Sequence, residues 1–352
     1  MNVLMVGVDK TSIGGMLTVV ENYWNSEFFC KKTNLRYIPS VINKSPLIKI
    51  LYFLIAFLRI FACILLHQID IVHIHMAERT SVYREGLVAK FAKILRCKVI
   101  IHMHGADIEQ WYDSLGSIKK KITRYFISCA DKVIILGENW RSFMERIVSN
   151  KKRIEVVYNA VDVPPYNKYN PDAKNIIFLG MIIPRKGILD LLDALKSIEL
   201  QLPKDIKVLL YGNDKNKNIQ ALISERNLEK RVSFCGWLDG KNRACCFQTA
   251  IINVLPSYHE GLPMSILETM AYGVPNISTT IAAIPEVIKN GENGMIVNPG
   301  DVSSLANAIL YLATEKKLRK KFSEASYETI CKKFAIEQHL NHIISLYETV
   351  LS

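Results

Sequence analysis

Two acidic residues in the second half of the chain have the type and spacing to hold a polyhydroxyl ligand. Glu260 and Glu268 lie in the segment SYHEGLPMSILETMAYGVP, residues 257–275, and seven mostly uncharged residues separate them. A carboxylate accepts hydrogen bonds from sugar hydroxyls, and its two oxygens can accept a pair of bonds from a ribose diol. The two side chains could therefore hold two different sugar rings, if one short element fixes both.

A buried strand followed by a short helix is predicted around the two glutamates. The apolar run IINVLPS is typical of the strand, Pro263 suits the first helical position, and Gly273 suits a C-terminal stop. We predict a helix over residues 263–272, with Glu260 in the loop before it and Glu268 in its second turn. The free N–H groups at the start of this helix favour an anion such as phosphate.

A ribose, a diphosphate and a hexose together would satisfy these groups, so the segment could bind a nucleotide-sugar. Ordinary helix capping beside a solvated carboxylate explains the same residues equally well. The residues of this segment alone leave both interpretations open.

The chain of 352 residues is long enough for two domains of similar size. Its 49% of hydrophobic and 22% of charged residues are typical of a globular protein. None of the eight cysteines forms a CxxC pair, which indicates reduced core residues of a cytoplasmic protein. The start, MNVLMVGVDK, lacks the basic and long apolar regions of a signal peptide and reads as a first buried strand.

Apolar runs rich in Val and Ile alternate with helical patterns, which predicts parallel sheets covered on both faces. We expect an α/β fold of two doubly wound Rossmann-like domains, residues 1–165 and 166–334, facing across a cleft. A segment rich in Pro and Asn places the hinge near residues 163–173. From about residue 301 the chain is helical only, and a last helix over about 335–352 would pack back on the first domain. Ligands bind such sheets beyond the carboxyl ends of the strands.

The first half of the chain also has features that suit an anionic surface. The net charge is +12, and residues 1–165 carry 23 basic and 14 acidic residues, against 22 and 19 in the remainder. The most apolar run, residues 47–66, is interrupted by Lys49 and Arg59. It could be a buried or half-buried helix, a helix in the membrane interface, or a membrane span. Nucleic acid is disfavoured as a partner because zinc-finger spacing, a basic heptad helix and an aromatic RNA-binding strand are all missing from the sequence.

Nearly the whole chain resembles the retaining family-4 glycosyltransferases of GT-B fold. Glu260 and Glu268 match the Glu-x7-Glu signature of that family. GVDKTSIGGM resembles its first Gly-rich loop, HMHGAD its His-Gly turn, and VVYNAVD the end of its interdomain strand. FLGMIIPRKGILDLLDAL resembles its Gly-Arg-x4-Lys-Gly loop, and GVPNISTTIAAIPEVIKNGENGMIVNPGD the stretch after the signature. Each motif is weak alone, whereas their common order and spacing are specific.

The resemblance implies a role for each matching residue. His104 would face the transferred sugar, Glu268 would bind the ribose, and Lys186 would neutralise the diphosphate. Glu260, with the backbone that follows it, would hold the donor sugar and diphosphate; His104, Glu260 and Lys186 are thus the catalytic candidates. The implied donor site consists of Gly14, Gly15, Arg185, Lys186, Glu260, Gly261, Leu262, Pro263, Met264 and Glu268.

One position departs from the family pattern. Met181 stands where the family usually has Arg, so a cation expected near the leaving diphosphate is replaced by an apolar side chain. Arg185, beside Lys186, could substitute for it from a different direction.

No metal cofactor is expected. His73, His75, His102 and His104 alternate on two predicted strands, and their same-face spacing could form a metal site. Buried histidines bonded to the backbone explain them more simply. The sequence also has no Asp-x-Asp pair that would hold a metal-bridged diphosphate, so backbone amides and Lys186 would carry the charge of the leaving group.

The predicted activity is retaining transfer of a hexose or N-acetylhexosamine from a nucleotide-diphosphate sugar, a UDP-sugar by expectation. The expected acceptor is a lipid-linked saccharide in capsule, O-antigen or exopolysaccharide synthesis. The protein would be cytoplasmic and peripheral on the anionic inner face of the plasma membrane. A sugar-nucleotide epimerase of the same fold is one alternative. A non-catalytic scaffold that binds nucleotide-sugar or membrane is the other, and Met181 is its only support.

Overall fold

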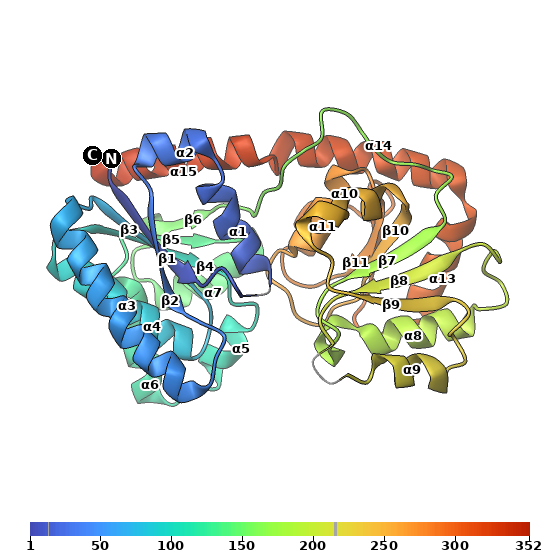
Figure 1. Cartoon of the computed structure of the whole chain (residues 1–352), viewed down its shortest axis with the longest axis horizontal. Coiled ribbons are helices and arrows are strands. Elements are labelled where there is room, and N and C mark those ends of the chain that lie inside the picture. The colour runs from blue at the N-terminus through green and yellow to red at the C-terminus, as the bar shows by residue number, and fades with distance from the viewer. Residues whose placement is uncertain (13, 215–216) are drawn as a thin grey trace. The chain divides into compact units, whose positions relative to one another are not determined.

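The computed structural model describes residues 1–12, 14–214 and 217–352, and it divides the chain into two units (Figure 1). The first unit comprises Met1–Ala160 together with Ile336–Ser352, and the second comprises Val161–Ala335. The division after Ala160 thus precedes the boundary that we placed after residue 165. Each unit contains a six-stranded sheet in which all pairings are parallel, so the expected pair of doubly wound α/β domains is confirmed.

The sheet of the first unit has the strand order β2-β1-β3-β4-β5-β6. The order therefore reverses between β1 and β3. The strands are β1 (Val3–Val8), β2 (Arg36–Val41), β3 (Ile71–Met76), β4 (Lys98–Met103), β5 (Lys132–Ile135) and β6 (Ile154–Val156).

Helices cover both faces of this sheet, as Figure 1 shows for α1 and α15 on one side and α3, α4 and α6 on the other. The helices of this unit are α1 (Gly15–Trp24), α2 (Glu27–Thr33), α3 (Pro46–His67), α4 (Thr80–Ile94), α5 (Ile108–Asp113), α6 (Ser117–Ser128), α7 (Arg141–Ile147) and α15 (Ile336–Leu351). Two short 3₁₀ turns, η1 (Glu138–Trp140) and η2 (Lys151–Arg153), complete it.

The sheet of the second unit has the order β12-β11-β10-β7-β8-β9, which reverses between β7 and β10. Its strands are β7 (Asn175–Leu179), β8 (Lys207–Tyr211), β9 (Val232–Gly236), β10 (Ala250–Leu255), β11 (Asn276–Thr279) and β12 (Gly294–Val297). Its helices are α8 (Ile188–Ser197), α9 (Ile219–Glu225), α10 (Gly240–Gln248), α11 (Met264–Ala271), α12 (Ile284–Val287), α13 (Val302–Thr314) and α14 (Lys316–Lys333), and η3 (Pro184–Lys186) follows β7. The tail after residue 301 is helical, as expected.

Two strands, β2 and β12, lack a long apolar run in the sequence, and each lies at the edge of a sheet. β2 pairs only with β1, and β12 pairs only with β11. β2 contains Pro39, which interrupts a strand pattern because proline lacks the N–H of a central strand. β12 has only four residues, too few for a periodic signal.

The segment expected as the hinge, residues 163–173, lies wholly in the second unit and is bonded to it. Pro164 accepts a hydrogen bond from the Tyr327 hydroxyl at 2.6 Å, and Asn167 donates to Ser323 Oγ at 2.9 Å. The segment is thus attached to the second unit. A composition rich in Pro and Asn is the same for an attached segment and for a free linker, so it did not distinguish the two.

Only one stripe of the apolar helix α3 is buried. Ala56, Ile60 and Ile64, four residues apart, form its buried stripe, whereas Leu58 is 67% and Leu66 75% exposed. One stripe of α3 is thus buried in the first unit, and most of its remaining apolar side chains are exposed. By length and composition alone, α3 could also cross a membrane.

Four stacked histidines form the core beneath α1 and α15. His73 and His75 share one face of β3, His102 and His104 share the same face of β4, and His75 lies opposite His102 in register. Burial lowers the pKa of His73 and His104 to about 3, and it lowers the pKa of His75 and His102 well below the usual range. All four rings are therefore neutral at pH 7.

Hydrogen bonds from α15 hold this core. Tyr347 on α15 bonds through its hydroxyl to His73 Nδ1 at 2.5 Å. His339 Nδ1 lies 2.9 Å from the carbonyl oxygen of Tyr158, which can only accept, so His339 Nδ1 carries the proton. Its Nε2 must then accept from the Tyr23 hydroxyl, 2.7 Å away. These bonds tie α15 to α1 and β3, and the Tyr158 carbonyl fixes the direction of both hydrogen bonds of His339.

We predict that the free energy of unfolding falls as the pH is lowered from 7 to 5. Below about pH 6.5 the unfolded chain binds protons that the folded histidines, with a pKa of about 3 for His73, do not bind. Stability is then lost by up to about 1.4 kcal/mol per pH unit for each histidine. Denaturant titrations at several pH values measure this slope. His73→Phe should make the slope shallower and the exposed-site control His67→Gln should not; equal slopes would refute the assignment.

Candidate functional site

The candidate residues of the second unit gather at the carboxyl edge of its sheet, where the strand order reverses. Lys186 ends η3 in the loop after β7, and Glu260 lies in the loop after β10. β7 and β10 are the two neighbours between which the order changes direction. Doubly wound sheets bind ligands at this position.

Lys186 and Glu260 form a largely buried ion pair. Lys186 Nζ lies 2.5 Å from Glu260 Oε1, and the two side chains are only 15% and 8% exposed. Glu260 Oε1 also accepts a hydrogen bond from Ser257 Oγ at 2.7 Å. The ammonium group has three N–H donors and uses one here, so it can still donate to a neighbouring anion.

The loops that carry this pair are locked together through their backbones. Gly187 has φ +69°, and a Cβ at this position would lie 2.0 Å from the carbonyl oxygen of Pro256. The N–H of Tyr258 donates to the carbonyl of Arg185 at 2.9 Å. A side chain at residue 187 would therefore push the two loops apart and separate Lys186 from Glu260.

The helix after Glu260 is α11, and it leaves two amide groups available. Pro263 has extended φ and ψ and caps the helix, which corrects our placement of it as the first helical residue. Proline is tolerated at either position because neither requires its N–H. Among the residues that the structure describes, the N–H groups of Met264 and Ser265 have no acceptor. Gly273, at φ +72°, ends the helix as predicted.

Glu268 lies in the second turn of α11, apart from the Lys186–Glu260 pair, and contacts a residue that the sequence did not single out. Arg243 on α10 approaches Glu268 Oε1 to 2.5 Å through its terminal nitrogen NH1. Burial raises the pKa of the Glu268 carboxyl to about 7, and the Arg243 guanidinium opposes this rise. No spacing in the sequence predicts that α10 and α11 bring these two residues together.

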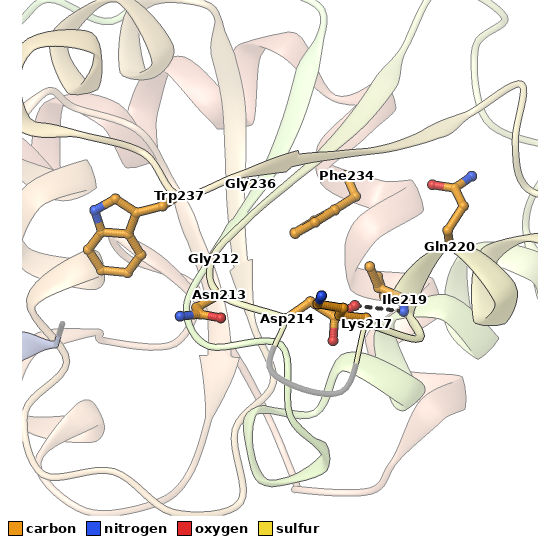
Figure 2. A pocket seen from close by; sticks show the side chains of 9 residues that line it. All are labelled: Gly212, Asn213, Asp214, Lys217, Ile219, Gln220, Phe234, Gly236 and Trp237. Carbon is orange, nitrogen blue, oxygen red and sulfur yellow. Dashed lines mark hydrogen bonds between the residues drawn. The ribbon is translucent and has the colours of Figure 1, made fainter. Parts of the chain in front are cut away.

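A cavity of about 440 Å³ opens at the carboxyl ends of β8 and β9. In Figure 2 the rings of Phe234 and Trp237 border it, with Asn213 and Asp214 below them. The backbone N–H of Ile182, in the loop that leads to Lys186, donates to the carbonyl of Asn213 at 3.1 Å. The lining residues are Gly212, Asn213, Asp214, Lys217, Ile219, Gln220, Phe234, Gly236 and Trp237. The sequence does not predict this cavity, although one glycine follows β8 and another ends β9 at this place.

The candidate residues of the first unit lie at the corresponding edge of its own sheet. His104 directly follows β4, is half-buried, and bonds through Nε2 to His75 Nδ1 at 2.8 Å. A Cβ at Gly105 would lie 2.7 Å from the backbone nitrogen of Glu78, so only glycine permits this turn. Gly14, at φ +140°, is the N-cap of α1, and Gly15 is its first residue. Since the pKa of His104 is about 3, this ring can offer a hydrogen bond but no charge at neutral pH.

The remaining predicted residues lie in the same loops of the second unit. Met181 and Arg185 are half-buried in the loop after β7. The side chains of Leu262 and Met264 are buried, which leaves their backbone as the part that can meet a ligand. Gly261 accepts a bond at its carbonyl from the N–H of Ala283 at 3.3 Å.

The stacked histidines have nitrogen atoms that could bind a metal ion, but the lone pairs of these atoms do not point to a common centre. Potential ligand atoms of His73, His75 and His102 all lie within 4.8 Å of one another. The His73 ring is tilted by only 8° from that of His75 and by 23° from that of His102. Because the lone pair of an imidazole nitrogen lies in the ring plane, nearly parallel rings do not converge on a tetrahedral ion.

Two family models together match most of the chain. The model described as Glycosyltransferase Family 4 matches residues 18–164, and that described as Glycosyl transferases group 1 matches residues 164–329.

Similar proteins extend over most of the chain. The N-acetyl-alpha-D-glucosaminyl L-malate synthase of Bacillus anthracis is 28% identical over 300 residues, which cover 80% of this chain and 74% of that relative. The UDP-Gal:alpha-D-GlcNAc-diphosphoundecaprenol alpha-1,3-galactosyltransferase of Escherichia coli is 24% identical over 378 residues, covering 98% and 94%. The solved structure of Anabaena Alr3699/HepE in complex with UDP has a TM-score of 0.77 at 16% identity, covering 99% of this chain and 100% of that one.

We predict that Gly187→Ala weakens both the fold and the site. The added methyl group meets the Pro256 carbonyl and also forces alanine to positive φ, which together cost on the order of 1–3 kcal/mol or more. Gly291→Ala is the matched control, since φ is +78° there but a Cβ would meet no described atom within 4 Å. Thermal unfolding compares the two variants. A melting temperature equally lowered in both would show that contact with Pro256 plays no part.

Proposed function

This chain belongs to the family 4 glycosyltransferases of GT-B fold, and from that premise we propose that it is a retaining hexosyltransferase. It moves a hexose or N-acetylhexosamine from a UDP-sugar to a lipid-linked saccharide. Its relatives include a glycosyltransferase named for lipopolysaccharide core biosynthesis and a poly(ribitol-phosphate) alpha-N-acetylglucosaminyltransferase, which supports a role in capsule, O-antigen or exopolysaccharide assembly.

The arrangement along the carboxyl edge of the second sheet carries this proposal. Trp237, which lines the cavity, lies in the chain just before α10, and Arg243 on α10 pairs with Glu268 on α11. Glu260 lies in the loop that leads into α11. A base in the cavity, a ribose at Glu268, a diphosphate at the amides of α11 and a sugar at Glu260 would follow one another in the order of a nucleotide-sugar.

A uridine nucleotide is the donor class that the similar proteins favour. The Escherichia coli relative is named for UDP-Gal, and Alr3699/HepE is described in complex with UDP and with UDP-glucose. The aromatic rings of Phe234 and Trp237 offer this chain a surface on which a flat base can stack.

The proposed chemistry is substitution on the same face of the sugar. The bond between the anomeric carbon and the β-phosphate oxygen breaks while the acceptor oxygen bonds to that carbon, and the acceptor proton passes to the departing phosphate. Glu260 already accepts from Lys186 and Ser257, so it is better suited to orient the sugar than to attack it. Lys186 and the free amides of α11 stabilise the charge that grows on the diphosphate, without a metal ion. His104 contacts the transferred sugar as a neutral hydrogen-bonding group.

The acceptor is proposed to be presented at a membrane, with the enzyme peripheral on its cytoplasmic face. Exposed apolar side chains on α3, α4 and α6, such as Leu58, Phe91 and Ile118, form what we call the apolar face. Phe57 and Phe91 join α3 to α4, with ring centroids 5.0 Å apart. The exposed Lys119, which neighbours Ile118, is one of several basic residues that suit anionic lipid. The Escherichia coli relative is named for a diphosphoundecaprenol-linked acceptor.

Kinetic analysis of two variants tests the donor site. Glu268→Ala should mainly raise the KM for the donor, because the ribose contact exists before and during transfer. Lys186→Ala should lower kcat, by about tenfold or more, because its charge matters most as the diphosphate departs. Lys196→Ala, which removes an exposed lysine paired with Glu199, is the control and should change neither constant.

Stability shifts with UDP, GDP and ADP identify the base beforehand, since a ligand of the folded state raises its melting temperature.

Unchanged kinetics of Lys186→Ala would refute the mechanism. Release of an isomerised nucleotide-sugar without acceptor would instead indicate an epimerase. Tight UDP binding without turnover of any donor would indicate a scaffold.

Flotation with liposomes tests the membrane contact. We expect the protein to float with vesicles that contain anionic lipid and less with neutral vesicles. Leu58→Glu, at an exposed position of the apolar face, should reduce flotation. Leu200→Glu alters a leucine of the second unit that is 99% exposed, and it should leave flotation unchanged. Recovery of the wild-type protein entirely in the unbound fraction would contradict the proposal.

A further inference from the structure

The Arg243–Glu268 pair joins two helices and is shielded from water. The side chain of Arg243 is 28% exposed and that of Glu268 16%, whereas many other ion pairs of the chain lie on the surface. NH1 of Arg243 contacts only Oε1 of Glu268 among the described contacts. The second oxygen, Oε2, is therefore available to a further donor.

Burial and the guanidinium act on Glu268 in opposite directions. Removal from water favours the neutral carboxyl and raises its pKa to about 7, and Arg243 favours the charged carboxylate. A neutral carboxyl keeps a proton on one oxygen and accepts hydrogen bonds weakly. With a pKa of about 7, about half of the Glu268 carboxyl is ionised at pH 7, and without Arg243 burial would be unopposed and this ionised fraction would fall.

The surroundings of Glu268 offer no replacement for this charge among the described residues. α11 packs against α14, β10 and β11 as well as lying beside α10. On the sheet side of α11, Thr269 contacts the neutral Asn276. On α14, the buried Arg319 donates to the carbonyl oxygens of Leu312, Ala313 and Pro171. Arg243 is the charged group that acts on the Glu268 carboxyl.

We propose that Arg243 is a positioning residue of the donor site, which holds Glu268 as an oriented carboxylate so that Oε2 can accept from the ribose diol. This inference rests on the proposed function, because it takes Glu268 as the ribose acceptor. Arg243 need not touch the donor. Its effect is that donor affinity depends on pH through Glu268.

The affinity for UDP-glucose at different pH values tests this role, since its diphosphate does not titrate between pH 6.5 and 9. Arg243→Gln should bind about tenfold more weakly at pH 7 and regain wild-type affinity towards pH 9, where Glu268 ionises without help. Arg243→Lys keeps a positive charge and should retain most of the affinity at pH 7. Arg226→Gln, which removes an arginine paired with Asp193 in the same unit, should bind normally throughout.

A deficit in Arg243→Gln that is equal at every pH would overturn the proposal, because a merely structural role is not rescued by alkali. A ¹³C NMR titration of the Glu268 carboxyl, assigned with Glu268→Gln, needs no ligand. We expect a midpoint near 7 in the wild type and a higher one in Arg243→Gln. An unchanged midpoint overturns the inference even if UDP-glucose does not bind. A raised midpoint in a protein that binds no nucleotide supports the pairing and refutes the proposed function alone.

Discussion

The close approach of two loops at Gly187 and Pro256 is the constraint on which the donor site depends. A charged lysine and a glutamate can stay 2.5 Å apart away from water only if their backbones are fixed. The carbonyl of Pro256 takes the space that a side chain at residue 187 would fill, and this fixes both loops. The reversal of strand order between β7 and β10 brings these loops to the same point of the sheet edge. The strand order, the absence of a Cβ at Gly187 and the Lys186–Glu260 ion pair thus together hold the two loops in place.

The second unit places its acidic residues in two different electrostatic settings. A lysine within hydrogen-bond distance balances the charge of Glu260, and a serine hydroxyl donates a hydrogen bond to it. At Glu268, burial favours the neutral carboxyl and an arginine favours the carboxylate. The first is suited to a ligand group that lies beside a positive charge, and the second to a neutral diol. In the proposed function the same residue type would serve two parts of one substrate, and the difference comes from the neighbours rather than from the glutamates.

Two kinds of feature could be predicted from the sequence: strands with a long apolar run, and element ends marked by a turn residue. Apolar runs predict central strands such as β3 and β10, and Gly273 marks the end of α11. The edge strand β2 lacks such a run, because Pro39 interrupts it. The resemblance located Lys186 and Glu260, but their direct contact depends on loop geometry that no local pattern encodes. Arg243 could not be predicted from the sequence for the same reason, because its partner Glu268 lies on a neighbouring helix.

The attachment of α15 to the first unit has a consequence for synthesis on the ribosome. Val161–Ala335 is continuous in sequence, so the second unit can complete its core as soon as it has emerged. The first unit, although translated earlier, needs Tyr347 against His73 and His339 against Tyr23. Its buried imidazoles stay uncovered until the last helix is made, so the half of the protein that is translated first is the half that matures last.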